Sequence, residues 1–119
     1  MYEKLGAVES RFAEIIWRSE PLTSGQLVQL CQQELQWKKP TTYTVLRKLC
    51  ERGLFQNVNG VVTSQISKAE FHALQSEKFL EETFEGSLPA FIAAFTTRKA
   101  LSAEEIAQIR KMIDSYGEG

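Results

Sequence analysis

The chain has 119 residues, of which 43% are hydrophobic and 24% are charged, and this composition suits one or two small folded domains rather than a disordered segment. It contains no apolar run long enough to cross a membrane and no secretory signal pattern, so we expect a soluble, cytoplasmic protein without membrane insertion. Because the net charge is −1, the chain is not uniformly basic, and any binding of nucleic acid must depend on a local patch of positive charge.

The first predicted helix covers residues 7–19 and carries an apolar stripe at helical spacing. The stripe consists of Val8, Phe12, Ile15, Ile16 and Trp17. Pro21 ends this helix, because the residue before a proline is disfavoured in the α conformation. Thr23 and Gln26 then have the spacing of a capping box, in which each side chain bonds the backbone N–H of the other, so they predict a second helix that ends near Leu35.

A third helix and a β-hairpin follow. Pro40 suits the first turn of a helix, and Gly53 suits the position just after the end of one. Asn59-Gly60 separates two short segments rich in apolar residues, and this dipeptide favours a two-residue hairpin turn because both residues tolerate a positive φ. Three helices followed by a hairpin is the order of a winged helix-turn-helix, so residues 1–66 are predicted to form a winged-helix DNA-binding domain.

Residues 67–119 are predicted to form a second, helical domain, which makes the whole chain mainly α. Capping-box patterns at Ser67 and Ser102 each start a helix, and Ser87 starts a shorter one between them. Three helices in about 50 residues bury too little apolar surface to be stable alone, so we expect them to form a dimerisation domain that pairs with a second copy of the chain. The expected homodimer interface residues are Phe84, Leu88, Phe91, Ile92, Phe95, Ile106, Ile109 and Ile113.

The third helix has the two faces expected of a helix that reads DNA. Its apolar side carries Thr42, Val45, Leu46, Leu49 and Cys50. Short hydroxyl side chains on the other side would allow close approach to base edges, and cations at the border would reach phosphates. The expected DNA-binding residues are Lys38, Lys39, Thr41, Tyr43, Thr44, Arg47 and Lys48. An ordinary amphipathic helix whose polar face meets water is the alternative, but two lysines at a helix N-terminus oppose the helix dipole, and phosphate contact would offset that cost.

The sequence predicts no metal site, no cofactor and no catalytic residue. Cys31 and Cys50 occupy apolar positions of helical stripes, and neither has a second cysteine or histidine at the spacing of metal ligands. The single histidine, His72, lies in a charged segment where we expect it to be exposed. Paired glutamates such as those at 81–82 are adjacent in sequence and so do not share a helix face. A binding protein is therefore favoured over an enzyme.

Four groups of residues follow one another along the chain and together form a pattern. They are Glu9 with Ile15-Ile16-Trp17, then Trp37 through Thr41, Thr44, Leu46 and Leu49 to Gly53, then Phe79-Leu80 with Phe84 and Gly86-Ser87-Leu88, and finally Leu101-Ser102 with Glu104-Glu105-Ile106. In this order and spacing they resemble the penicillinase repressor family, the BlaI/MecI/CopY group, over nearly the whole chain. The resemblance implies a repressor whose dimer binds a palindromic double-stranded operator. It also places Thr41 and Thr44 at base-facing positions and Lys48 at a basic position of the recognition helix.

The chain departs from this family pattern in its wing and at the start of the third helix. Relatives usually carry Gly-Arg in the wing, whereas residues 60–65 contain no cation, which weakens the expectation of a phosphate contact there. Pro40 stands one residue later than the usual proline of the family. No cysteine follows Cys50, so the copper sensing of one family branch is not expected. The uncharged wing and the acidic pI keep a second function open, that of a winged-helix protein-interaction module with weak or no DNA binding.

The resemblance also implies a candidate switch. In beta-lactam-responsive relatives, derepression follows cleavage in the dimerisation domain, and the partner implied here is a membrane-bound metalloprotease-receptor. Alignment through Ser87-Leu88 and Phe95 places the corresponding bond at Ala94–Phe95, with alanine where those relatives carry asparagine. The alternative, which the missing asparagine favours, is that Ala94 and Phe95 are ordinary core residues of a repressor with another signal or none.

Overall fold

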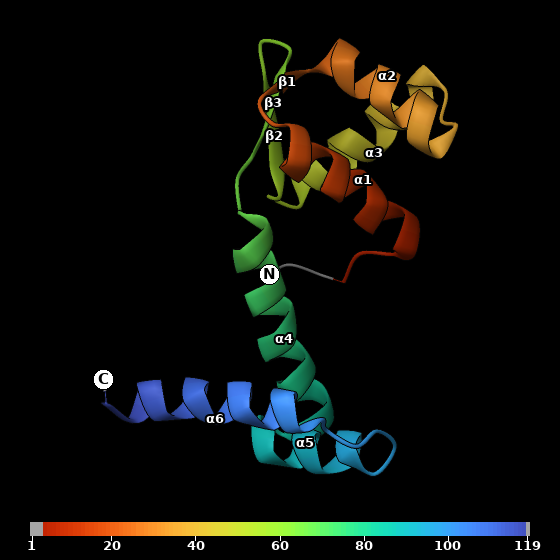
Figure 1. The fold of residues 1–119 in the computed structure, drawn as a ribbon. Helices are drawn as coiled ribbons and strands as arrows, with labels where there is room; N and C mark the ends of the chain where they lie inside the picture. The colour runs from red at the N-terminus through yellow and green to blue at the C-terminus, as the bar shows by residue number, and fades with distance from the viewer. Residues whose placement is uncertain (1–3, 119) are drawn as a thin grey trace. The chain divides into compact units, whose positions relative to one another are not determined.

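The computed structural model describes residues 4–118, which form two compact units divided between residues 78 and 79 (Figure 1). The first unit contains α1 (Ala7–Ser19), β1 (Leu22–Thr23), α2 (Ser24–Leu35), α3 (Lys39–Glu51), β2 (Phe55–Val58), β3 (Val61–Ser64) and the start of α4 (Lys68–Phe84). The second contains the end of α4, α5 (Leu88–Thr96) and α6 (Ala103–Glu118). The expected fold class, a winged helix-turn-helix followed by a helical C-terminal part, is confirmed. No helix among residues 4–118 is long and apolar enough to span a bilayer.

The helices begin where the capping residues predict. The Thr23 side-chain oxygen accepts a bond from the Gln26 N–H (3.1 Å), and the Gln26 side chain accepts one from the Thr23 N–H (2.9 Å). Ser102 and Glu105 form the same reciprocal pair before α6, at 3.0 Å in both directions. Ser87 accepts a bond from the backbone at the start of α5. Each cap satisfies N–H groups that have no partner inside their helix.

The hydrophobic core of the first unit lies between α1, α2, α3 and the hairpin. Its largest fully buried apolar side chains are Phe12, Ile15, Ile16, Leu27, Leu49, Leu54, Phe55 and Val62. Phe71, from the first turns of α4, is also buried and lies 5.6 Å from Trp17 between ring centroids. Helix α1 has the predicted bounds, but Val8 of its apolar stripe remains 49% exposed, while Ala13, which is not part of that stripe, is fully buried.

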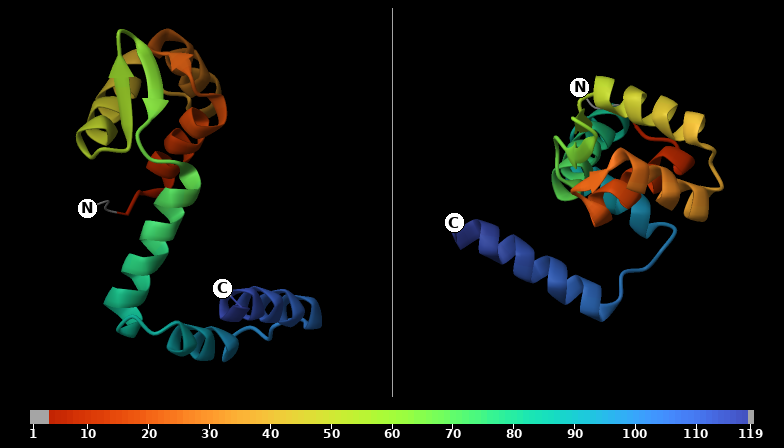
Figure 2. Two further views of the ribbon diagram at one scale, coloured as in Figure 1. Left: turned by 90° about the vertical axis from the view of Figure 1, so that its left-hand side faces the viewer. Right: turned by 90° about the horizontal axis from the view of Figure 1, so that it is seen from above.

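The three strands form an antiparallel sheet in the order β1-β3-β2, and Figure 2 shows the hairpin β2–β3 beside the helices of the first unit. Asn59 and Gly60 have φ values of 52° and 79°, as the predicted two-residue turn requires. The sequence did not predict β1, whose two residues pair with β3 in the register Leu22↔Val62 and Thr23↔Val61. This third strand attaches the hairpin to the start of α2.

The second unit is built around phenylalanine rings on α4 and α5. Phe84 and Phe91 pack edge to face with centroids 5.6 Å apart, and Phe79 lies 6.0 Å from Phe91. Glu85 and Gly86 both have positive φ values, which end α4 and turn the chain into α5. No described residue from 79 to 117 is buried, although the unit is rich in large apolar side chains.

Candidate nucleic-acid interface

Helix α3, the expected recognition helix, is fixed at both ends by its backbone. Lys38 is the N-cap, and its carbonyl accepts bonds from the N–H groups of Thr41 (3.0 Å) and Thr42 (3.2 Å). Pro40 occupies the first turn, where a proline removes no helical hydrogen bond. At the other end, Gly53 has a φ of 85°, a left-handed conformation that closes the helix C-terminus. The helix is therefore a defined element with a fixed face toward the core.

The side chains of α3 divide into a buried and an exposed set. Thr42, Leu46 and Leu49 are buried, and Val45 and Cys50 are half-buried, as predicted. The seven residues expected to bind DNA are all exposed, on α3 or at its N-cap: Lys38, Lys39, Thr41, Tyr43, Thr44, Arg47 and Lys48. The structure thus gathers these residues on one helix, where all of them are accessible to a large ligand.

Thr44 has a defined side-chain conformation. Its hydroxyl donates a hydrogen bond to the Pro40 carbonyl one turn earlier, at 2.9 Å. The hydroxyl hydrogen is therefore occupied, while the lone pairs of the oxygen and the methyl group remain available. A threonine in this state can accept a hydrogen bond from a base edge or pack its methyl group against a thymine methyl.

Tyr43 connects α3 to α2 through a hydrogen bond. Its hydroxyl donates a hydrogen bond to the Ser24 side-chain oxygen (3.2 Å), and Ser24 is the first residue of α2. The ammonium group of Lys39 lies 5.9 Å from the centre of the Tyr43 ring, within the range of a cation–π contact. Sequence reasoning missed Ser24, because nothing in its local pattern indicates a partner 19 residues away.

The N-terminal end of α3 concentrates positive charge. Residues 38–52 contain five Lys and Arg residues and a single acidic residue, Glu51, at the far end of the helix. No acidic residue occupies the first turn, and no side chain caps the helix. Lys38 and Lys39 therefore add to the positive end of the helix dipole. An anion such as a phosphate would be stabilised there by both sources of charge.

Two side chains hold the open end of the hairpin. One is Trp17 of α1, and the other is Glu20, the C-cap residue of α1. The Glu20 carboxylate accepts bonds from the Ser64 backbone N–H (2.8 Å) and from the Ser64 hydroxyl (2.9 and 2.8 Å to its two oxygens). The Trp17 indole N–H donates to the carbonyl of Ile66, just after β3, at 3.0 Å. Both contacts join residues more than 40 positions apart and were not predicted. They fix the orientation of the wing relative to the helices.

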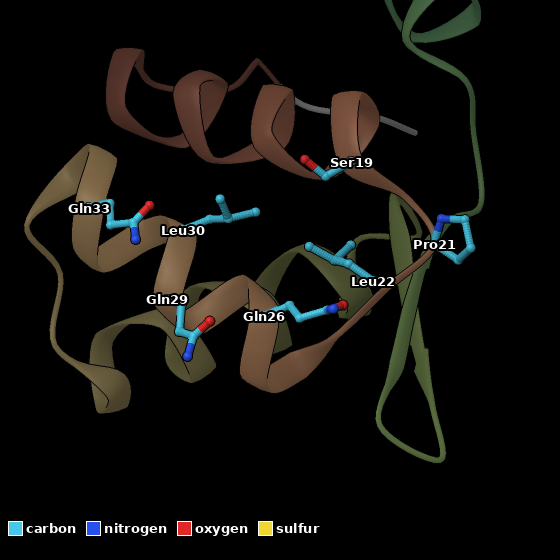
Figure 3. Close-up of a pocket in the computed structure, with 7 residues that line it drawn as sticks. All are labelled: Ser19, Pro21, Leu22, Gln26, Gln29, Leu30 and Gln33. Atoms are coloured by element: carbon cyan, nitrogen blue, oxygen red, sulfur yellow. The ribbon is translucent and has the colours of Figure 1, made fainter.

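Several surface hollows lie on the first unit. One, of about 350 Å³, separates α3 from the hairpin and is lined by Tyr43, Leu46, Arg47, Cys50 and Asn57. Another, of about 370 Å³, is shown in Figure 3 and is lined by Ser19, Pro21, Leu22, Gln26, Gln29, Leu30 and Gln33. None of the residues in this second hollow is ionisable, so it offers no group for acid–base or metal chemistry. Among residues 4–118, no three His, Cys, Asp or Glu side chains are grouped as metal ligands.

The two cysteines are protonated thiols rather than nucleophiles. Burial raises the pKa of the Cys31 thiol, a hydrogen bond with the Thr42 hydroxyl offsets part of that rise, and the Glu34 charge adds a smaller rise. Burial also raises the pKa of Cys50, with a contribution from Glu51. Because only the thiolate is reactive, neither cysteine is suited to catalysis or metal binding at neutral pH.

The residues expected at the dimer interface lie in the second unit without being covered by it. Phe84, Phe91, Ile92 and Ile109 are half-buried, and Leu88, Phe95, Ile106 and Ile113 are exposed. Large exposed apolar side chains that the prediction omitted are Phe79, Met112 and Tyr116. Ala94 and Phe95, the residues of the candidate cleavage site, are both exposed, so neither is a core residue of the single chain.

Comparison with known proteins places the chain in one family. It is 21% identical to the penicillinase repressor of Bacillus licheniformis over 117 residues, which cover 95% of this chain and 91% of that protein. It is 19% identical to the methicillin resistance regulatory protein MecI of Staphylococcus aureus, and 18% identical to MecI of Staphylococcus epidermidis, over 93% of this chain and 94% of each relative. The family model of the penicillinase repressor matches residues 5–115. The chain therefore belongs to the penicillinase repressor family, a family of transcriptional repressors.

Proposed function

We propose that the chain represses transcription by binding a palindromic operator as a homodimer, with α3 of each copy in the major groove. The observation that carries the proposal is the exposed face of α3, where threonines stand among lysines and an arginine with no acidic side chain before Glu51. In this proposal residues 1–66 bind DNA and residues 67–119 form the dimer. Phosphates supply most of the affinity, and base edges supply the sequence preference.

Each exposed residue of α3 has a role that follows from its chemistry. Thr41 and Thr44 are short enough to let the helix approach base edges, which they contact through oxygen atoms and methyl groups. Arg47 and Lys48 reach phosphates, and Lys38, together with the helix N-terminus, binds a phosphate at the other end. Lys39 also contacts phosphate, while Tyr43 holds α3 against α2 through Ser24.

Dimer formation covers the apolar side chains of the second unit. In the single chain Ile113 is 61% exposed, Leu88 53% and Phe95 44%, and no described residue beyond Phe71 is buried. Large apolar surfaces of this kind mark an interface in a stable protein. A two-fold pairing of residues 67–119 would place two winged helices on half-sites about one DNA turn, ~34–36 Å, apart. The second helix then binds at a high effective concentration, which raises the affinity of the dimer over that of one winged helix.

A second function is supported by the charge of the chain. This function is that of a winged-helix module that binds a protein and not DNA. It fits the net charge of −1. It also fits the hairpin, because residues 55–64 carry no charged side chain. Salt distinguishes the two functions, because the affinity of a DNA-binding protein falls steeply with salt concentration as counterions are released. An interaction module would show little binding to DNA at any salt concentration.

The experiment starts from a pool of random double-stranded DNA, from which the full chain selects its own sites. Repressor function predicts that the selected sequences contain an inverted repeat, and that affinity for this duplex exceeds affinity for a scrambled duplex of the same composition. A variant with Thr41→Ala and Thr44→Ala serves as the test of the reading face, and Glu51→Gln, on the same helix beyond that face, serves as its control. Failure to enrich any sequence would contradict the proposal.

A second proposal concerns the switch: proteolysis at Ala94–Phe95 by a membrane-bound metalloprotease-receptor, against the alternative, favoured by the alanine at position 94, of another signal or none. The bond lies near the end of α5, where the Ala94 carbonyl accepts a bond from the Thr97 N–H (3.3 Å) and the Phe95 carbonyl one from the Lys99 N–H (3.1 Å). Cleavage there would separate α6 from the rest of the interface and so weaken the dimer. Mass spectrometry of cells that carry the receptor, with and without a beta-lactam, should reveal a fragment of residues 1–94. Release of the operator while the repressor stays intact would exclude this switch.

A further inference from the structure

The hollow of about 350 Å³ between α3 and the hairpin has the size of a site for a small molecule. One wall is a stripe of α3 with members three or four positions apart, which places them on one side of the helix: Tyr43, Leu46, Arg47 and Cys50. Asn57 of β2 forms the opposite wall. Sites for small organic ligands usually have volumes of roughly 300–1,000 Å³. The hollow therefore suits a ligand at the small end of this range.

Most of the wall formed by α3 is apolar and uncharged. The side chain of Leu46 is buried, and that of Cys50 is half-buried. Burial raises the pKa of the Cys50 thiol, so this group is neutral at neutral pH. The ring of Tyr43 adds an aromatic surface, and none of the lining residues is acidic. The apolar body of a ligand could therefore be desolvated here without stranding a buried charge.

Two polar side chains of the hollow have no partner. Among residues 4–118, neither the Arg47 guanidinium nor the Asn57 amide forms a hydrogen bond or an ion pair. A guanidinium presents parallel N–H groups that match the two oxygens of a carboxylate, and the amide offers a further N–H donor. One cation beside apolar walls suits a singly charged carboxylate better than a phosphate dianion. The charge and the shape of the hollow thus both favour an organic carboxylate.

Hydrogen bonds tie the two walls together at both ends of the hollow. At one end, the Tyr43 hydroxyl donates to the Ser24 side chain (3.2 Å), and the Ser24 N–H donates to the carbonyl of Gly60 in the hairpin turn (2.9 Å). At the other end, the Leu54 N–H donates to the carbonyl of Leu49 near the end of α3 (3.0 Å). A ligand would therefore enter a hollow that is already formed, and little affinity would be lost to ordering of its walls.

We propose that this hollow binds a small organic carboxylate with a flat apolar body, and that its binding releases the operator. The carboxylate pairs with Arg47 and Asn57, and the apolar body lies against Leu46, Cys50 and the Tyr43 ring. Release of the operator rests on the proposed repressor function, in which Arg47 contacts a DNA phosphate. Because one guanidinium cannot pair with both anions, ligand and DNA exclude each other. The chain would then respond to an inducer without being cleaved.

Binding is tested first on the full chain without DNA, by titration with 2-naphthoate followed in ¹H–¹⁵N NMR spectra. The largest shift changes should fall on the backbone amides of the residues that line the hollow. Two further probes each lack half of the proposed contact. 2-Naphthamide has the same shape without the charge, and inorganic phosphate has charge without the apolar body. Each should bind at least about tenfold more weakly than 2-naphthoate.

The substitution Arg47→Gln removes the cation from the hollow and should raise the Kd for 2-naphthoate by about tenfold. Its Kd for 2-naphthamide should match that of the parent. Lys48→Gln is the matched control, because Lys48 is an exposed cation on the same helix that does not line the hollow. This control should bind DNA more weakly than the parent, yet its Kd for 2-naphthoate in the absence of DNA should be the same.

Competition is then measured on a duplex with a single half-site that the parent has selected from random DNA. At about ten times its own Kd, 2-naphthoate should raise the apparent Kd for this duplex by about tenfold, whereas 2-naphthamide at the same concentration should have a much smaller effect. Each of three results would overturn the inference while leaving the repressor function intact. They are no binding of 2-naphthoate to the free chain, equal binding by parent and Arg47→Gln, and binding that does not displace DNA. Equal affinity for inorganic phosphate would also overturn it, since the hollow would then be an anion contact only. Absence of DNA binding by the parent would instead refute the repressor function, and the titrations of the free chain would still decide whether the hollow binds a carboxylate.

Discussion

The substitution Ile113→Asp tests the proposed dimer at a single exposed position of α6. Ile113 is 61% exposed in the single chain. Complete burial of an isoleucine is worth about 1.5–3 kcal/mol, so covering the exposed part would contribute ~1–2 kcal/mol for each copy and ~2–4 kcal/mol for a symmetric pair. The variant loses this contribution, which raises the dissociation constant of the dimer by about 30- to 1,000-fold. Desolvation of the new carboxylate increases the effect.

Sedimentation velocity over a range of protein concentrations measures this change directly. The parent should be a dimer at micromolar concentration, and Ile113→Asp should be a monomer under the same conditions. Ser115→Asp is the matched control, since Ser115 is exposed on the same helix and lies on the side opposite the apolar stripe. If the parent remained a monomer, or if Ile113→Asp dissociated at the same concentration as the parent, the assignment of this interface would be refuted.

Four further outcomes are expected from the first unit. Lys48→Ala should weaken binding to all DNA sequences alike and lower the slope of log affinity against log salt by about one for each half-site. Thr44→Ala should instead relax the base preference at one position. Fluorescence anisotropy on sets of duplexes measures both effects. Trp17→Phe removes the indole N–H that binds the backbone after β3 and should lower the free energy of unfolding by about 1–3 kcal/mol in urea titrations. Because burial raises the pKa of Cys31, this thiol should resist alkylation at neutral pH until the protein is unfolded, as mass spectrometry would detect.

Much of the fold could be predicted because its signals are local. The caps at Thr23 and Ser102, the Asn59-Gly60 turn and the spacing of buried residues on α3 each depend on neighbours within a few positions. The positions of the expected DNA-binding residues on one exposed helix follow from the same periodicity. No knowledge of the tertiary structure was needed for these features.

The missed features depend on contacts between distant segments. The strand β1 has two residues, too few to show an alternating pattern, and it exists only because β3 lies beside it. The bonds between Glu20 and Ser64 join residues 44 positions apart, and neither residue type indicates the other. Val8 fits the apolar stripe of α1 but lies in its first turn, where the structure leaves it 49% exposed. Helical spacing alone could not distinguish it from the core positions further along.

Binding of operator DNA through α3 is tested most directly by the dependence of Kd on salt for the full chain and its selected palindromic duplex. The exposed cations Lys38, Lys39, Arg47 and Lys48 give four charges for each copy and eight for a dimer. If each neutralises one phosphate, the slope of log affinity against log salt should be about −7. A duplex with a single half-site should bind much more weakly and with about half that slope. Weak binding with a slope near zero on both duplexes would contradict the account.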